Sequence, residues 1–220
     1  MPNRISVVGG TGALGGALAL RYARAGLAVT IGSRDAVRAA AAAAKIAADA
    51  GCGQVTGLDN RAAAAAGDIV FVTVPFSSQE ETLKAVRDAC RGKIVVDTTV
   101  PLVPPKVARV QLPAQGSAAQ IAAELLGPDV RVVSGLHNIS ATKLGMPGDP
   151  GCDVLVFGDD VDARGAIVDS LGGIGLRAFH AGPLANSAAA EAMTSVLISI
   201  NKRHQVKDGA GIRITGPDLE

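Results

Sequence analysis

Ile5–Gly16, with the sequence ISVVGGTGALGG, has the pattern of a strand, a glycine-rich turn and the start of a helix. Residues 5–8 form a short, mainly β-branched run, which suits a buried parallel strand. The motif G-x-G-x-x-G is matched by Gly10-Thr11-Gly12-Ala13-Leu14-Gly15, and an Ala/Leu-rich helical pattern continues to Ala25. A strand, a turn and a helix in immediate succession are the context in which this motif predicts a dinucleotide-binding site.

The glycines of this motif have distinct expected roles. Gly10 allows the tight turn, Gly12 lets the backbone approach a pyrophosphate, and Gly15 lets the helix pack close to the strand. The free N–H groups of the first helical turn and the helix dipole favour the negative charge of the phosphates. A glycine turn without a ligand is the alternative, and the strand and helix around it argue against that alternative.

The second expected strand, residues 28–31, ends at a group of residues that indicates which dinucleotide binds. NAD-binding domains usually carry an Asp or Glu here, about 20 residues beyond the glycines, for the ribose 2′-hydroxyl. This chain has Ser33 with Arg34 beside it and Arg38 one helical turn further. Because arginine offers a bidentate donor to a 2′-phosphate, we predict NADP(H). Asp35 leaves NAD(H) as an alternative, because it would be the acid that binds the ribose if the register of the motif is shifted.

Strands and helices alternate along the chain, which predicts an α/β fold with a Rossmann-type, doubly wound, mostly parallel sheet. Further strands are expected at residues 54–57, 68–74, 93–97, 130–133, 153–158 and 176–180, and helices at 35–50, 60–66, 79–90, 117–126, 162–171 and 188–201. Val74, Pro75 and Phe76 lie at the end of the most hydrophobic strand and should flank the cofactor. We expect an NADP-binding domain at residues 1–145 and a small C-terminal lobe at residues 146–220.

Length and composition restrict the class of protein. The chain has 220 residues, of which 48% are hydrophobic, so a sizeable core is expected. The net charge of +1 argues against a general nucleic-acid-binding role. The first strand leaves no room for a signal peptide, and no run of about 18 apolar residues predicts a membrane span. The cysteines Cys52, Cys90 and Cys152 lack metal-ligand spacing, so we expect reduced thiols, no metal site and a cytoplasmic location.

The common catalytic constellations do not occur in the sequence. The single tyrosine, Tyr22, is not part of a Tyr-x-x-x-Lys motif, and there is no G-x-S-x-G motif. His137 follows an expected strand and is the one weak candidate for a catalytic residue, as a proton donor to a carbonyl; a hydrogen-bonded structural role is the alternative. Hydride transfer between two redox cofactors needs mainly proximity, alignment and exclusion of water, so it suits a chain without an evident acid or base.

The chain resembles the F420-dependent NADP reductases over nearly its whole length, because six motifs occur in the order seen in that family. They are Gly9–Gly15, Gly32–Arg34, Thr73–Phe76, Val100–Pro104, Leu136–Ala141 and Ala181–Ser187. The segment Gly209–Arg213 also looks like the C-terminal segment of the family. Asn138 and Ser140 depart from the Thr and Pro of some members.

The resemblance implies how two cofactors, NADP(H) and the deazaflavin coenzyme F420, are bound. It implies pyrophosphate contacts from Thr11, Gly12, Ala13 and Leu14, and a 2′-phosphate site made by Ser33, Arg34 and Arg38. It also implies apolar residues around the nicotinamide, namely Val74, Pro75, Ile139 and Ala141, with Ala210 where the two cofactors meet. Phe76 stands where an aromatic residue is common in the family.

We therefore expect an oxidoreductase, an NADPH-dependent F420 reductase that transfers hydride reversibly between NADP(H) and F420. Two alternatives stay open: an NADP-dependent reductase of a small carbonyl or imine with His137 as proton donor, and a non-catalytic NADP(H)-sensing module. The expected partners are small-molecule cofactors, without nucleic acid or membrane. We also expect a homodimer, because Ala192, Met193, Val196 and Ile200 form an apolar stripe on the last helix. Packing of that stripe on the chain's own sheet is the alternative.

Overall fold

The computed structural model describes residues 4–51 and 54–216, so Cys52 lies outside the described residues. The strands are β1 (Arg4–Val8), β2 (Ala28–Ser33), β3 (Val55–Asp59), β4 (Ile69–Val72), β5 (Ile94–Asp97), β6 (Arg131–Ser134), β7 (Val154–Gly158) and β8 (Ala178–His180). The helices are α1 (Ala13–Arg24), α2 (Ala36–Ala50), α3 (Asn60–Ala66), α4 (Phe76–Val86), α5 (Ala118–Leu126), α6 (Ala141–Gly145), α7 (Val161–Gly172) and α8 (Ser187–His204). Two short 3-10 turns span Arg87–Cys90 and Leu184–Asn186.

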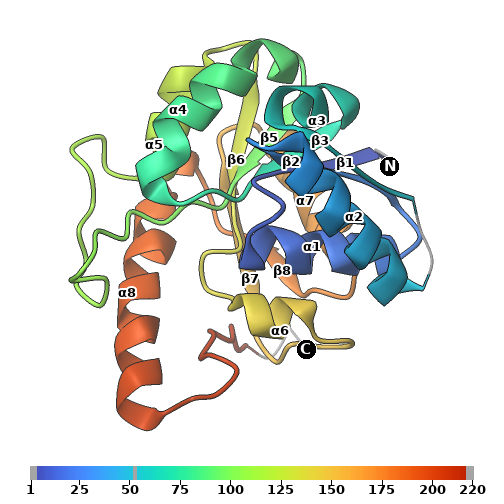
Figure 1. Ribbon diagram of the computed structural model, residues 1–220. Coiled ribbons are helices and arrows are strands. Elements are labelled where there is room, and N and C mark those ends of the chain that lie inside the picture. Colours follow the sequence, from blue (N-terminus) through green and yellow to red (C-terminus); the bar gives the residue numbers. More distant parts are fainter. Residues whose placement is uncertain (1–3, 52–53, 217–220) are drawn as a thin grey trace.

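The described strands form an eight-stranded sheet in the order β3-β2-β1-β4-β5-β6-β7-β8, with helices on both faces (Figure 1). Strands β1 to β6 are parallel, β7 runs antiparallel to β6, and β8 runs parallel to β7. The chain moves outward from β1 to β3 and then returns to β4 on the other side of β1. This change of direction confirms the predicted doubly wound, mostly parallel α/β fold and creates a crevice at the carboxyl ends of β1 and β4.

Two apolar clusters fill the space between the sheet and its helices. One cluster joins α1 and α7 to one face of the sheet and includes Tyr22, Phe71 and Ile167. The other joins α4 and α5 to the opposite face and includes Leu83 and Leu126. Adjacent strand residues point to opposite faces, which explains why the central strands are apolar at nearly every position and buried on both sides.

Most expected elements are present, and the differences lie at their ends. The structure adds α6, a five-residue helix that is too short to give a helical period in the sequence. It also begins α4 at Phe76 rather than at residue 79. Within the described residues, no helix is long and apolar enough to cross a membrane.

The chain after residue 145 extends the same sheet through β7 and β8. Helix α7 packs on the larger apolar cluster, while α8 extends away from the sheet beside the irregular segment 98–116 (Figure 1). Ser195 of α8 donates a hydrogen bond to the Val107 carbonyl of that segment at 2.9 Å. The predicted division at residue 145 into an NADP-binding domain and a smaller lobe stays a prediction.

Candidate functional site

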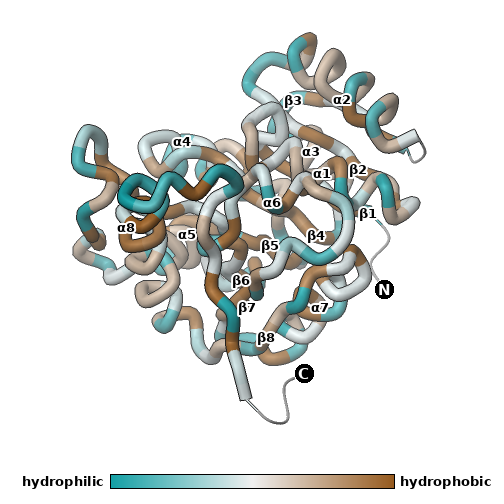
Figure 2. The backbone as a smooth tube through the Cα atoms, turned by 90° about the horizontal axis from the view of Figure 1, so that it is seen from below, coloured by the Kyte–Doolittle hydropathy of each residue, from teal (hydrophilic) through white to brown (hydrophobic). Residues whose placement is uncertain are grey.

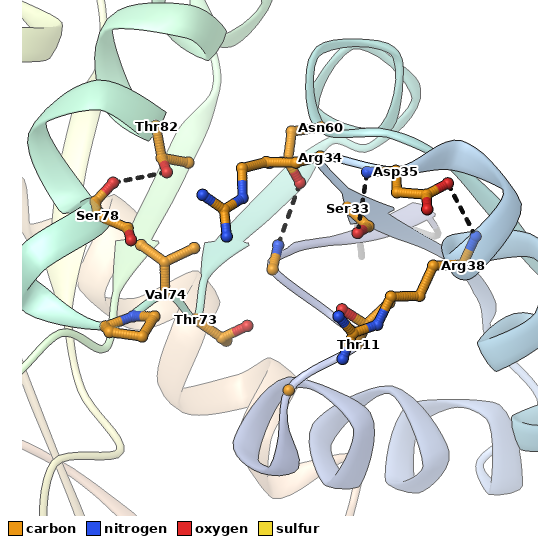
Figure 3. Close-up of a pocket in the computed structure, with 13 residues that line it drawn as sticks. Thr11, Ser33, Arg34, Asp35, Arg38, Asn60, Thr73, Val74, Ser78 and Thr82 are labelled. Atoms are coloured by element: carbon orange, nitrogen blue, oxygen red, sulfur yellow. Dashed lines mark hydrogen bonds between the residues drawn. The ribbon is translucent and has the colours of Figure 1, made fainter.

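A cleft opens at the carboxyl ends of β1, β2 and β4 (Figure 3). It is lined by the glycine-rich turn, by the end of β2 with the start of α2, and by the start of α4. Its lining residues are Gly9, Thr11, Gly12, Ser33, Arg34, Asp35, Arg38, Asn60, Thr73, Val74, Pro75, Ser78 and Thr82. This is the crevice in which open α/β sheets bind nucleotides.

The glycine-rich turn has the geometry of a phosphate-binding loop, with one change in the expected roles. The left-handed backbone conformation falls on Gly9, with a φ of 77°, and not on Gly10. Gly10 is required for a different reason: a Cβ atom there would lie 2.7 Å from the Cβ of Ile31. Gly15 packs against the residue that follows β4, since its Cβ would meet Thr73, while Gly12 is exposed and leaves room for a ligand.

Asp35 lines the cleft and caps α2 through one of its two carboxylate oxygens. One of its carboxylate oxygens, Oδ1, accepts hydrogen bonds from the backbone N–H groups of Val37 at 2.9 Å and Arg38 at 3.2 Å. Its own N–H donates to the Ser33 hydroxyl at 3.2 Å. An N-terminal cap of this kind stabilises the helix and fixes the orientation of the carboxylate. The geometry therefore favours the helix-capping role of Asp35 over a role as ribose ligand.

Two arginines provide the positive charge of the cleft. Figure 3 shows the Arg34 side chain extending across the cleft toward α4 and the Arg38 side chain extending toward Thr11. Both residues are exposed, and in the described part of the chain neither guanidinium has a hydrogen-bond or ion-pair partner. Unpaired guanidinium groups at the end of β2 are suited to bind a phosphate in bidentate geometry.

The structure brings together about half of the predicted site residues in this cleft. Thr11, Gly12, Ser33, Arg34, Arg38, Val74 and Pro75 line it, and Gly10 and Gly15 lie buried beneath it. Outside its lining are Ala13, Leu14, Phe76, Ile139, Ala141 and Ala210.

Four further lining residues carry polar groups and were not expected at the site from the sequence. They are Asn60, Thr73, Ser78 and Thr82. Asn60 follows the end of β3, and its Oδ1 accepts a hydrogen bond from the Gly9 N–H at 3.3 Å. Because Asn60 directly follows a parallel strand, its position in the sequence could have indicated a site residue.

Ala141 and Ala210 lie close together at a second location, beyond the carboxyl end of β6. Ser140 caps α6, and its hydroxyl hydrogen-bonds the Asp208 carbonyl. The Ala210 N–H donates to Oδ1 of Asn201 at 2.6 Å. Because β4 and β6 are parallel in one sheet, this location is at the same sheet edge as Val74 and Pro75.

His137 is buried away from the cleft. Its side chain packs near the ring of Phe157, and neither ring nitrogen has a hydrogen-bond partner among the described residues. Burial lowers the pKa of His137 to about 4, so the imidazole is neutral at neutral pH. A buried, neutral histidine outside the cleft lining is poorly suited to protonate a substrate there. The expected alternative, a hydrogen-bonded structural role, is not seen among the described residues either, and the imidazole is packed in the interior.

A buried polar network holds both ends of the segment 98–116. At its start, the Asp97 carboxylate accepts hydrogen bonds from Gln79 at 2.9 Å and Thr99 at 2.8 Å. At its end, the Glu191 carboxylate of α8 accepts from the N–H groups of Ala118 at 2.7 Å and Ala119 at 3.1 Å. Both carboxyl groups are buried, and burial raises the pKa of Asp97 to about 6 and that of Glu191 to about 8.

The raised pKa of Glu191 predicts a pH-dependent stability. Between its ordinary pKa of 4.5 and about 8, the folded protein retains a proton that the unfolded chain loses, so the free energy of unfolding falls as pH rises. Glu191→Gln removes the contribution of this titration. The free energy of unfolding of the variant should therefore fall less than that of the wild-type protein between about pH 5 and about pH 8. Urea unfolding across this range measures it. Glu124→Gln, on the exposed face of α5, is the control and should keep the wild-type slope.

Comparisons with known proteins agree with this geometry. Residues 4–101 match the family model described as NADP oxidoreductase coenzyme F420-dependent. The chain is 41% identical to an F420-dependent NADP reductase of Methanothermobacter thermautotrophicus, over 100% of this chain and 98% of that protein. It is 36% identical to the F420-dependent NADP reductase of Methanocaldococcus jannaschii, over 98% of this chain and 100% of that protein.

Solved structures show the same fold. The crystal structure of a protein from Arthrobacter sp. FB24 matches with a TM-score of 0.81 at 23% identity, over 98% of this chain and 100% of that chain. An imine reductase from Bacillus cereus matches with a TM-score of 0.62 at 18% identity, over 92% of this chain but 62% of that chain. At these identities the likeness concerns the fold alone. On the identity to its full-length relatives, this chain belongs to the family of F420-dependent NADP reductases.

Proposed function

We propose that this protein catalyses reversible hydride transfer between NADP(H) and coenzyme F420, as the names of its full-length relatives indicate. The observation in the structure that supports NADP(H) most directly is the position of Arg34 and Arg38 beside Asp35, whose carboxylate caps α2. Neither guanidinium has a partner among residues 4–51 and 54–216. A free carboxylate at this position would repel a 2′-phosphate, whereas two guanidinium groups attract it.

NADP(H) would be held at its two phosphate groups by different parts of the cleft. The pyrophosphate would lie at Thr11, Gly12, Ala13 and Leu14, where Gly12 leaves space and α1 begins without a side-chain cap, so that the N–H groups of its first turn can face the phosphates. The 2′-phosphate would bind Ser33, Arg34 and Arg38. Side chains at Gly9 and Gly10 would clash with Val74 and Ile31, so glycine at both positions keeps the turn in the shape that the pyrophosphate would approach.

The redox rings would lie at the sheet edge between the cleft and the carboxyl end of β6. The apolar residues around the rings would be Val74, Pro75, Phe76, Ile139 and Ala141, and Ala210 would close the far side. When bound, NADPH supplies a hydride to oxidised F420, and one proton from solvent completes the reduced deazaflavin. The protein's contribution would be to align the two rings and exclude water, with no side-chain acid or base required. Residues 146–220 would complete the F420 site.

The test of this function is anaerobic mixing of the protein with NADPH and oxidised F420. The visible absorbance of the oxidised deazaflavin should fall rapidly, and no carbonyl or imine substrate should be needed. Tight binding of NADPH without a change in the absorbance would contradict hydride transfer to F420. A screen of carbonyl and imine substrates would then separate a small-molecule reductase from a non-catalytic sensing module.

We also propose that the protein is a homodimer in the cytoplasm. Met193, Val196 and Ile200 of α8 are 38–44% exposed, so the apolar stripe is not covered by the chain's own sheet. The buried thiols of Cys90 and Cys152 form no disulfide, which suits a reducing compartment.

Light scattering at micromolar concentration should give the mass of a dimer, and Val196→Glu should shift it toward the monomer because it places a charge in the apolar stripe. Val37→Glu, at an exposed valine of α2, is the matched control and should leave the mass unchanged. A monomeric mass for the wild-type protein would contradict the proposal.

A further inference from the structure

The segment after α8 turns back and lies against the body of the protein. We call residues 207–216 the C-terminal strap. In Figure 1 the strap returns from the end of α8 toward α6, and in Figure 2 it runs past the ends of β6, β7 and β8. Its first part is attached to α6 and α8 through the bonds of Ser140 to Asp208 and of Asn201 to Ala210.

The far part of the strap is held by a charged pair of the sheet. Asp153, just before β7, forms a two-bond ion pair with Arg177, just before β8, with both N–O distances at 2.7 Å. The same groups bind the strap backbone: Asp153 Oδ2 accepts from the Ile214 N–H at 2.5 Å, and Arg177 donates to the Ile214 carbonyl at 2.6 Å. The Asp153 N–H donates to the Ile212 carbonyl at 2.8 Å.

The Asp153 side chain is fully buried, and its environment favours the charged form. Burial opposes ionisation, but the hydrogen bonds from Arg177 and from the Ile214 N–H outweigh it, so the pKa of Asp153 lies below its ordinary value. Each bond made by the Asp153 carboxylate or the Arg177 guanidinium involves at least one charged partner and is stronger than a neutral hydrogen bond. The far part of the strap is therefore held by the pair that the buried Asp153 forms with Arg177 rather than by a surface contact.

The middle of the strap lies flat on the chain beneath it because it contains glycine at two close approaches. A Cβ atom at Gly209 would lie 2.7 Å from the Cβ of Ser140, and one at Gly211 would lie 2.4 Å from the Cβ of Cys152. Ala210 stands between them and carries the one side chain of this stretch. The position of Ala210 is thus set by contacts on both sides of it.

The sheet register places this anchor at the edge where the redox rings are proposed to lie. Strand β7 pairs antiparallel to β6, with Ser134 opposite Phe157. The amino end of β7 therefore lies beyond the carboxyl end of β6, and Asp153 is at the same edge as Ile139 and Ser140. The strap crosses this edge between Ser140 and Asp153.

We propose that Asp153 and Arg177 are positioning residues that hold the C-terminal strap in place, so that Ala210 forms a wall of the F420 site. The proposal rests on the proposed function for its substrate, and on the contacts above for its geometry. The clamp acts through the strap and touches neither nucleotide. Loss of the clamp should therefore loosen the wall and weaken F420 binding, while NADP(H), which would be held mainly by its phosphate groups at the ends of β1 and β2, should keep its affinity.

The test is Asp153→Asn in the full chain, with Asp149→Asn as the matched control. Asp149 also pairs with the strap, through Arg213 at 3.3 Å, but both side chains of that pair are largely exposed. Asp153→Asn should raise the KM for F420 about tenfold and leave the Kd for NADPH within about twofold, since a charge-assisted anchor is lost at one site only. Asp149→Asn should change neither value by more than about twofold.

A second readout does not depend on activity. Trypsin cleavage after Arg213 requires the strap to open locally, so its rate follows the open population, which should rise about tenfold in Asp153→Asn. Cleavage at the wild-type rate would overturn the clamp. Faster cleavage with an unchanged KM for F420 would overturn the role of the strap in the site. A wild-type protein that does not reduce F420 would overturn the proposed function, and the cleavage comparison would still test the clamp.

The side chain of Asp153 is buried, so Asp153→Asn could prevent folding, and a folding defect would show as a lost melting transition. Asn201→Ala then replaces it, because it removes the acceptor of the Ala210 N–H at the other end of the strap. The same pattern is expected: a raised KM for F420, an unchanged Kd for NADPH and faster cleavage after Arg213. Equal changes in the binding of both nucleotides would contradict the proposal.

Discussion

Arg34→Ala is expected to weaken NADPH binding by about 1.5–3 kcal/mol, or roughly ten- to 150-fold, and to leave NADH affinity within about twofold. The guanidinium of Arg34 lies in the cleft without a partner in the described part of the chain, so its removal frees no buried group and disrupts no contact of the fold. The substitution should therefore lower the affinity only for a nucleotide that carries a 2′-phosphate. Fluorescence titration with each nucleotide measures the difference.

Arg91→Ala is the control for this measurement. Arg91 is exposed, pairs with Asp88 on the surface and is not one of the residues that line the cleft. Its variant should bind both nucleotides like the wild-type protein. If Arg34→Ala weakens NADPH and NADH equally, the residue supports the cleft rather than binding the 2′-phosphate.

Arg21→Met is expected to lower the free energy of unfolding by about 2–6 kcal/mol. Arg21 is a buried residue of α1 whose guanidinium donates to five backbone carbonyls, those of Leu144, Met146, Gly148, Ile174 and Gly175. Its bonds to Leu144 at 2.8 Å and Ile174 at 3.1 Å are buried, so two carbonyls would lose their partner away from water at about 1–3 kcal/mol each. Methionine retains the length of the side chain and isolates the loss of the polar bonds.

Arg24→Met is the matched control, one turn further along α1. Arg24 is exposed and donates to the Gly145 carbonyl at 3.2 Å. Its replacement should cost less than about 1 kcal/mol. Urea unfolding of both variants measures the difference, and equal losses would contradict the role of Arg21 as the link between α1, α6 and the turn before β8.

The fold and the phosphate end of the site could be predicted from the sequence because both depend on local patterns. A β-branched run, a glycine turn and an alanine-rich helix each act within a few residues, and the strands follow from their repetition. The arginines at the end of β2 were found for the same reason, since their position follows from the distance to the glycines. The role of Asp35 was left open because capping depends on where α2 begins.

Features that depend on contacts between distant residues could not be predicted. Arg21 has the sequence signature of a surface residue near a helix end, yet it contacts segments more than a hundred residues away. The left-handed conformation falls on Gly9 rather than Gly10, and the motif itself does not specify which of the two adopts it. The clamp at Asp153 required the antiparallel pairing of β7, and no local pattern indicates the direction of a strand.

Direct transfer of hydride is the central claim, and deuterium labelling tests it. NADPH carrying deuterium at nicotinamide C4, prepared separately in its (4R) and (4S) forms, would be mixed anaerobically with the protein and oxidised F420 in ordinary water. If the rings are held face to face, one form should deliver deuterium to the reduced F420 and the other should deliver none. Mass spectrometry of the reduced F420 gives the result. Reduced F420 without deuterium from either form would contradict direct transfer.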